Sequence, residues 1–546
     1  MTSAVAAPSP RAPLTSLAAL VGLCACTPTN AAPIDTQGPD SGQGATLTLA
    51  EPEPEADAQP GAAEEPETKA PQRPDSLGEF VRAHDGPVHL EFISQYGYVH
   101  VAEDAGQPFE MPAIIRLSAD DEAGQGPRPG LDLAIVLDRS GSMGGDKLRF
   151  AKQAGLDLVN RLDEQDRVTL ISYDDTVTPL SNLQRVDDDG IEVLRRQLLD
   201  IQVGGTTALG PALFMGLQRL AAPEPFGPQT RTEARHDRLR HVILLSDGIA
   251  NVGETRPEVI GGRVAEHFGG GVSVSTLGMG LDYNEDLMTR IADEGGGRYH
   301  FIEDAESIPA MLGDELAGLT ATVASEVDSV FATLPGTDVT EVYGYTQTVA
   351  GSDTTIRVGF LGAGQSREIV VNLRLDPEQV RGWAPGERVE LGEVEVRYRL
   401  VTGATEGGPA PMRSLAVPAT VLVAHDAAQA RASERTEVTV RAAEVAAARH
   451  IQAASVAVDQ GDFAEAQRLL ESASTDFEAL RDEAESEEVR EMLDSQLSDL
   501  EEAASSIEDA RSSAAERKKY SKKYKASSYS KGKGSKTKKK KSVKKK

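Results

Sequence analysis

Between residues 131 and 320, short apolar runs alternate with amphipathic stretches, and this alternation constrains the fold more than any other feature. Five runs have strand character, at 131–138, 167–173, 241–245, 272–277 and 299–302. The first is almost continuously apolar, as expected of a strand that is covered on both faces of a parallel sheet. Helical patterns lie between the runs, notably at 209–220 and 284–292. Residues 131–320 are therefore predicted to form an α/β domain with a doubly wound, mostly parallel sheet.

Both flanks of this domain have the pattern of antiparallel β-structure. Residues 86–118 and 321–424 contain short alternating runs that are separated by Gly, Pro and Asp. This pattern is typical of sandwich strands. We expect one β-sandwich built from 81–130 and 321–426, with the α/β domain inserted between two of its strands. Two separate small β modules are the alternative.

Residues 427–515 are rich in Ala, Glu and Leu and contain few prolines or glycines. Their apolar spacing predicts a small α-helical domain, a hairpin of two or three helices. The segment 456–473 resembles one helix pair of a tetratricopeptide-like repeat. About three such repeats are needed for a stable solenoid, so a peptide-binding groove is the less favoured alternative.

The last 30 residues differ sharply in charge from the rest of the chain. The formal net charge is −30, yet residues 517–546 hold 16 of the 56 basic residues and none of the 86 acidic ones. Such a segment repels itself, so 516–546 is predicted to be disordered and to bind a polyanion. The candidates are lipopolysaccharide, anionic lipid, extracellular DNA, another acidic polymer, or the protein's own acidic body. The predicted contact residues are Lys518, Lys519, Lys522, Lys523, Lys538, Lys539, Lys540 and Lys541.

The N-terminus has the pattern of a bacterial export signal. Residues 1–26 contain a ten-residue apolar run and end in Leu23-Cys24-Ala25-Cys26, which resembles a lipoprotein box with Cys26 as the lipidated residue. Residues 27–80 are acidic and rich in Pro and Ala, and we expect a disordered tether. The protein is thus expected to be lipid-anchored in the cell envelope. The outer membrane is favoured over the inner one, because Thr27 is not the Asp that retains many lipoproteins at the inner membrane.

Oxygen-bearing side chains follow the predicted strands of the α/β domain. Asp138, Ser140 and Ser142 come directly after the first strand, Thr206 follows two glycines, and Asp247 follows the strand at 241–245. The carboxyl ends of parallel strands meet at one edge of a sheet. Two carboxylates and three hydroxyls suit Mg²⁺, with Mn²⁺ or Ca²⁺ as alternatives, better than zinc. An ion with only two charged ligands would accept one more oxygen, best supplied by a partner's carboxylate.

The segments DRSGSM (138–143), GGTT (204–207) and LLSDG (244–248) together resemble the metal-ion-dependent adhesion site of a von Willebrand factor type A domain. The sequence of residues 275–312 is similar to that of the bacterial cell-envelope branch of this family. This branch is related to inter-α-trypsin inhibitor heavy chains and calcium-activated chloride channel regulators. The resemblance implies a metal-dependent protein ligand. Arg139 departs from the usual pattern and is expected to place a positive charge beside the ion.

We do not expect catalysis. No GxSxG elbow surrounds Ser140 or Ser142, and the glycines at 204–205 lack the lysine of a phosphate loop. The sequence favours a surface lipoprotein that binds a protein partner for adhesion or scaffolding. The alternative is an envelope assembly or secretion factor that holds client proteins at the same metal site.

Overall fold

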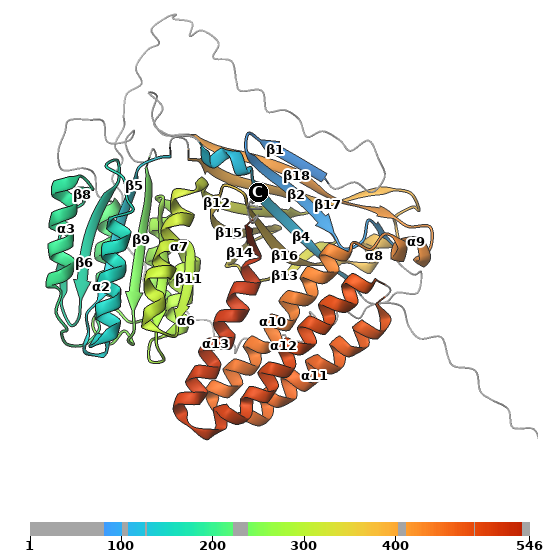
Figure 1. Ribbon diagram of the computed structural model, residues 1–546. Helices are drawn as coiled ribbons and strands as arrows, with labels where there is room; N and C mark the ends of the chain where they lie inside the picture. The colour runs from blue at the N-terminus through green and yellow to red at the C-terminus, as the bar shows by residue number, and fades with distance from the viewer. Residues whose placement is uncertain are drawn as a thin grey trace, which may run out of the picture.

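The computed structural model describes residues 81–100, 108–125, 128–221, 238–401, 411–484 and 486–537. An α/β domain, a β-sandwich and a bundle of long helices make up this part of the chain (Figure 1). The predicted signal segment with Cys26, the tether at 27–80 and the lysines at 538–541 lie outside the described residues. None of the described helices has the length and apolar character needed to cross a membrane.

The β-sandwich takes strands from both sides of the α/β domain. Its first sheet has the order β1-β2-β4-β16-β13, with β19 beside β16. The strands of this sheet are β1 (Val81–Asp85), β2 (Val88–Ser94), β4 (Phe109–Ala119), β16 (Gln365–Leu375), β13 (Thr337–Val342) and β19 (Ser535–Thr537). The second sheet has the order β14-β15-β12-β17-β18-β3. Its strands are β14 (Gln347–Ala350), β15 (Asp353–Gly362), β12 (Thr322–Thr333), β17 (Arg388–Leu400), β18 (Met412–Val423) and β3 (Tyr98–Val99).

The pairing of β4 with β16 joins the two flanks. The two strands are antiparallel, with Phe109 opposite Leu375 and Ser118 opposite Ser366. In the second sheet, β3 from the first flank pairs with β18 from the second. The flanks therefore form one sandwich with the α/β domain inserted between β4 and β12, and the two-module alternative does not apply.

The central strands of the first sheet, β4 and β16, are buried on both faces. Ile115 and Val371 pack in the core between the two sheets, together with Phe331 of the second sheet. Ile114 and Val370, one residue along on the same strands, point to the other face and pack against the helical bundle. Side chains alternate between the faces of a strand, so burial on both faces explains the continuous apolar runs in β4 and β16.

The α/β domain contains the predicted sheet. Its strand order is β11-β10-β9-β5-β6-β7, with β8 beside β6. The ladders joining β6, β5, β9, β10 and β11 are parallel, whereas β7 and β8 run antiparallel to β6. The strands are β5 (Leu131–Asp138), β6 (Arg167–Tyr173), β7 (Val177–Pro179), β8 (Gln184–Arg185), β9 (Leu239–Ser246), β10 (Val272–Met279) and β11 (Gly296–Ile302).

Helices cover both faces of this sheet. Those on one face are α2 (Asp146–Val159), α3 (Asp188–Asp200) and α7 (Ile308–Thr320), which pack against Leu133, Ile135 and Leu137 of β5. Those on the other face are α4 (Leu209–Ala221), α5 (Pro257–Gly269) and α6 (Glu285–Glu294), which pack against Ala134 and Val136. This is the doubly wound α/β fold that the sequence predicts.

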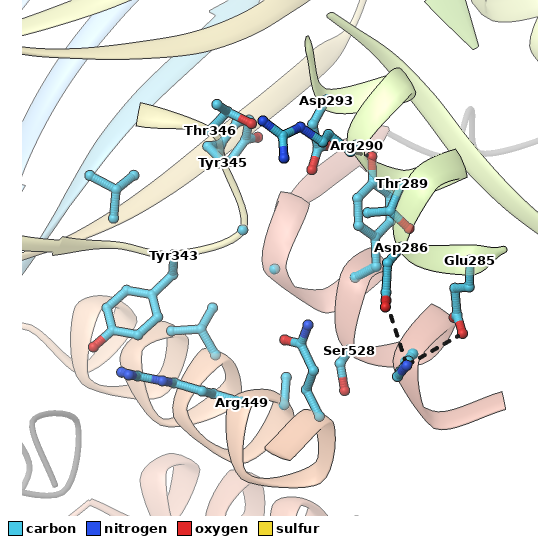
Figure 2. Close-up of a pocket in the computed structure, with 18 of the residues that line it drawn as sticks. Glu285, Asp286, Thr289, Arg290, Asp293, Tyr343, Tyr345, Thr346, Arg449 and Ser528 are labelled. Carbon is cyan, nitrogen blue, oxygen red and sulfur yellow. Dashed lines mark hydrogen bonds and ion pairs between the residues drawn. The ribbon is translucent and has the colours of Figure 1, made fainter. Parts of the chain in front are cut away.

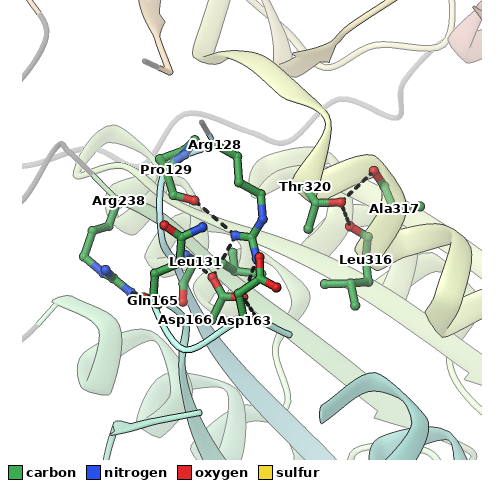
Figure 3. A network of polar contacts seen from close by, with 10 residues as sticks. All are labelled: Arg128, Pro129, Leu131, Asp163, Gln165, Asp166, Arg238, Leu316, Ala317 and Thr320. Atoms are coloured by element: carbon green, nitrogen blue, oxygen red, sulfur yellow. Dashed lines mark hydrogen bonds and ion pairs between the residues drawn. The ribbon is translucent and has the colours of Figure 1, made fainter. Parts of the chain in front are cut away.

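A polar network holds the point where the chain enters the α/β domain (Figure 3). Arg128, just before β5, donates to Asp166 at 2.8 and 2.6 Å and to Asp163 at 2.6 Å. Asp166 also accepts from the backbone N–H of Leu131 at 2.9 Å. The network lies at the amino end of β5, and α7 leaves the domain from the same end (Figure 3). The opposite, carboxyl edge of the sheet is therefore far from this junction, by roughly 23 Å for an eight-residue strand.

The helical domain is larger than predicted. The short helix α9 (Ala427–Ala432) precedes four long helices: α10 (Thr436–Gln460), α11 (Phe463–Glu483), α12 (Glu487–Ser512) and α13 (Ala514–Lys533). The prediction of a two- or three-helix hairpin ending at 515, followed by disorder from 516, is wrong for the described residues. Tyr520 and Tyr524 of the Lys-rich segment are buried in the core of the bundle. Strand β19 then adds the end of the segment to the sandwich.

Acidic groups elsewhere in the protein make this helix possible. The four described lysines of the predicted polyanion site all contact the protein itself. Lys518 pairs with Asp282 at 2.7 Å, Lys519 with Glu303 at 2.8 Å and Lys523 with Glu502 at 2.8 Å, while Lys522 donates to the carbonyl oxygen of Tyr283 at 3.0 Å. Of the polyanions considered, these lysines meet the protein's own acidic body. The lysines of the tail repel one another, but pairing with carboxylates of the α/β domain and of helix α12 offsets this repulsion.

Candidate metal centre

Strand β5 lies at the switch point of the α/β sheet. Its neighbours are β6, which follows it through α2, and β9, which is reached only after β6, α3 and α4. In open α/β sheets, ligands bind outside the carboxyl ends of the strands at such a point. Asp138 is the last residue of β5, and Asp247 follows the last residue of β9. The fold therefore brings together the two carboxylates that are 109 positions apart in the sequence.

Hydroxyl groups connect the two carboxylates, whose side chains are both fully buried. Asp138 accepts from the Ser140 backbone N–H at 2.8 Å and from the Ser246 hydroxyl at 2.7 Å. Asp247 accepts from the Ser142 hydroxyl at 2.7 Å, and the Ser140 and Ser142 oxygens are 3.2 Å apart. Four of the five predicted ligands thus lie in one cluster at the edge of the sheet.

Two buried carboxylates concentrate negative charge in the cluster. Burial raises the pKa of Asp138 above its ordinary value, against the hydrogen bonds from Ser140 and Ser246, and the nearby charge of Asp247 adds to the rise. A carboxylate whose charged form is disfavoured in this way is stabilised by any cation that binds beside it.

A glycine loop closes over the cluster. The N–H of Gly141 donates to the carbonyl oxygen of Gly205 at 2.9 Å, and the N–H of Gly204 donates to that of Arg139 at 2.7 Å. A side chain at 204 has no room, because a Cβ there would lie 1.8 Å from an oxygen of Asp174. Asp174, which follows β6, also accepts from the Gly205 N–H at 3.2 Å. The sequence reasoning missed this residue, although it stands in the same strand-end position as Asp138.

Arg139 does not stand free beside the predicted ion. Its guanidinium pairs with Asp174 at 3.0 Å. Burial alone would raise the pKa of Asp174, but hydrogen bonds from Thr176 and Gly205, together with the Arg139 charge, lower it to about 2. The positive charge of Arg139 is thus neutralised by a carboxylate that stays ionised near neutral pH.

The structure favours Thr207 over Thr206 as the threonine ligand. The Thr206 side chain is exposed, whereas Thr207 is buried. The hydroxyl oxygens of Thr207 and Ser142 both lie within 4 Å of the point where a Cβ on Gly248 would stand. The Thr207 backbone N–H is fixed by the side-chain oxygen of Asn251 at 2.9 Å. The sequence GGTT does not show which of its two adjacent threonines is the ligand. The difference in burial between their side chains does.

A lysine that the sequence reasoning did not consider also reaches the cluster. Lys147, in the first turn of α2, donates to the second oxygen of Asp247 at 2.5 Å. Its side chain is one-third exposed, and Asp247 is fully buried. The ammonium group of Lys147 thus binds a carboxylate that is also predicted to bind the metal ion.

The donor set fits a hard divalent cation. In the described part of the chain, no group of three or more His, Cys, Asp or Glu is placed to hold a metal, so a site here depends on its hydroxyls. Asp138 and Asp247 would supply the charge, and Ser140, Ser142 and Thr207 would supply neutral oxygens. Sulfur and imidazole, which zinc prefers, are absent from this set.

A separate hollow of about 610 Å³ lies where the three units meet (Figure 2). Its charged groups are largely paired with one another. Glu341 pairs with Arg449, and Asp293 accepts from Tyr529 at 2.9 Å and pairs with Lys533 at 2.7 Å. These pairs join α10 and α13 to the sandwich and the α/β domain, so the hollow is a junction between units.

Comparison with known proteins agrees with the fold of the α/β domain. Residues 132–314 match the family model of the von Willebrand factor type A domain. The protein therefore contains a von Willebrand factor type A domain, inserted in a β-sandwich. Domains of this family mediate protein–protein interactions and commonly bind a divalent metal.

Similar proteins occur in bacteria and in mammals. The chain is 28% identical to the uncharacterized protein sll0103 of Synechocystis sp. over 308 residues, which cover 54% of this chain and 68% of the relative. It is also 28% identical to the bovine inter-alpha-trypsin inhibitor heavy chain H3 over 232 residues, which cover 41% of this chain but only 23% of that protein. A solved von Willebrand factor type A protein from Catenulispora acidiphila has the same fold, with a TM-score of 0.55 at 18% identity over 78% of this chain and 91% of that one.

The two threonines give a direct test of the ligand set. Thr207→Ala removes a hydroxyl that faces the cluster, and we expect Mn²⁺ affinity to fall about tenfold. Thr206→Ala removes an exposed hydroxyl and is expected to leave the affinity unchanged. Calorimetric titration of both variants checks this, and equal effects of the two substitutions would contradict the assignment.

Proposed function

We propose that the protein binds a partner protein through a divalent metal ion, most favourably Mg²⁺, held by Asp138, Ser140, Ser142, Thr207 and Asp247. The observation that carries the proposal is the convergence of two fully buried carboxylates and several hydroxyls at the switch point of the sheet. Buried carboxylates are costly unless they are paired or bind a metal.

The ligand set favours recruitment of an acidic group. Only two of the five proposed ligands are charged and the other three are hydroxyls, so the ion would keep positions open for further oxygens. Mg²⁺ takes six oxygens and usually keeps several from water or from a ligand. A partner's carboxylate is the oxygen that such an ion attracts most strongly. The Ser142 side chain, which bridges to Asp247, is exposed, so this edge is open to solvent.

The insertion in the sandwich suits a binding role. Both chain crossings lie at the amino end of β5, where the Arg128 network holds the junction. The metal edge is at the other end of the strand, so a partner can approach it without contacting the sandwich. The helix α13 reaches this side of the domain through Lys518 and Asp282.

Metal titration tests the proposed site. We expect the full chain to bind Mg²⁺ and Mn²⁺ saturably, and Asp138→Ala to weaken both at least about 100-fold, because it removes one of only two charged ligands. Asp146→Ala is the matched control: this carboxylate is eight residues away, exposed, and paired with Arg149 at 2.7 Å. Calorimetry gives the affinities, and thermal melting verifies that both variants fold. Undiminished binding by Asp138→Ala would refute the site.

We further propose that the protein acts as an adhesion or scaffolding lipoprotein, anchored through Cys26 in the bacterial envelope, with the outer membrane favoured. The support is the sequence alone: the Leu23–Cys26 pattern and the acidic 27–80 segment behind it.

The anchor has its own test. In bacterial cells that express the chain, Cys26→Ser is expected to abolish incorporation of an alkyne-labelled fatty acid and to shift the protein from the membrane to the soluble fraction. Cys24→Ser is the matched control and is expected to remain labelled. Labelling that survives Cys26→Ser would contradict the assignment.

A further inference from the structure

Lys147 is the cation closest to the proposed metal ligands. Its Nζ donates to Asp247 at 2.5 Å, while the Ser142 hydroxyl donates to the other oxygen of the same carboxylate. Asp247 is fully buried, whereas the Lys147 side chain is one-third exposed, so water reaches the contact from the lysine side. Charge-assisted bonds of this kind are about twice as strong as neutral ones.

Two parts of the domain position this lysine. Helix α2, which carries Lys147 in its first turn, is anchored on the sheet by the buried Leu148 and Ala151. The β10–α6 loop approaches from the other side, where Gly280 has φ +71° and a Cβ on it would lie 3.3 Å from Nζ. The positive φ favours glycine at this position, and a side chain here would contact the ammonium group.

We propose that Lys147 sets the charge of the metal-loaded site and thereby its preference for an anionic ligand. This inference rests on the proposed function. A divalent ion with Asp138 and Asp247 alone is neutral overall. With the ammonium group bound to Asp247, the same assembly carries one positive charge, and the site attracts a carboxylate over a neutral oxygen such as water or an amide.

The proposal predicts that removing the charge of Lys147 changes the affinity for the metal and the affinity for a carboxylate in opposite directions. Lys147 repels the incoming ion and shares a carboxylate with it, so neutralising Lys147 strengthens metal binding. The loaded site then loses its net positive charge, so neutralising Lys147 weakens carboxylate binding. A lysine that only supports the fold would weaken both, and one that only fills the place of the metal would strengthen metal binding without changing the preference for a carboxylate.

The experiment uses Mn²⁺ and acetate as probes on the full chain. Mn²⁺ affinity is measured by the relaxation enhancement of water protons, and acetate is then titrated to displace water from the bound Mn²⁺. The variants are Lys147→Met and Lys147→Gln, which are neutral, and Lys147→Arg, which keeps the charge. Lys152→Met is the matched control, since Lys152 lies on the same helix and donates to the carbonyl oxygen of Leu199 instead of to Asp247.

We expect both neutral variants to bind Mn²⁺ about tenfold more tightly and acetate at least about threefold more weakly than the wild type. Lys147→Arg and Lys152→Met should resemble the wild type. Unchanged acetate affinity in the two neutral variants, or weakening of both probes, would overturn the inference while leaving the metal site intact. Absence of saturable Mn²⁺ binding in the wild type would overturn the proposed function as well.

Discussion

Two carboxylates buried at the ends of adjacent parallel strands are stable only if something balances their charge, and the architecture around Asp138 and Asp247 follows from that requirement. Ser246 and the Ser140 backbone donate to one, and Ser142 and Lys147 donate to the other. These bonds hold the two buried carboxylates close together at the edge of the sheet. A divalent ion between them would balance their charge. The proposed metal binding at this edge is thus a consequence of how the sheet is wound.

Electrostatics also organises the rest of the molecule. The chain is strongly acidic overall, and its excess of lysine is concentrated in the last 30 residues. Helix α13 uses that contrast, because its lysines pair with carboxylates of the α/β domain and of the bundle while Tyr520 and Tyr524 enter the bundle core. A segment that repels itself in isolation thereby joins three units of the fold.

The sequence predicts features that depend on local pattern. The strand at 131–138, the insertion in a sandwich, and four of the clustered site residues all follow from apolar periodicity and from position after a strand. Features that depend on distant partners were missed. The folding of 514–533 requires acids such as Asp282, and the choice of Thr207 over Thr206 requires knowledge of which side chain is buried. Lys147 was missed because it lies in the first turn of helix α2, whereas the site residues were sought directly after the strands.

The most direct test of the proposed metal site is to locate the bound metal by crystallography. Crystals of the protein grown with Mn²⁺ should give an anomalous-scattering peak at this edge of the sheet, beside Asp138, Asp247 and the hydroxyl groups of Ser140, Ser142 and Thr207. An anomalous map without a peak at this edge at saturating Mn²⁺ would contradict the account.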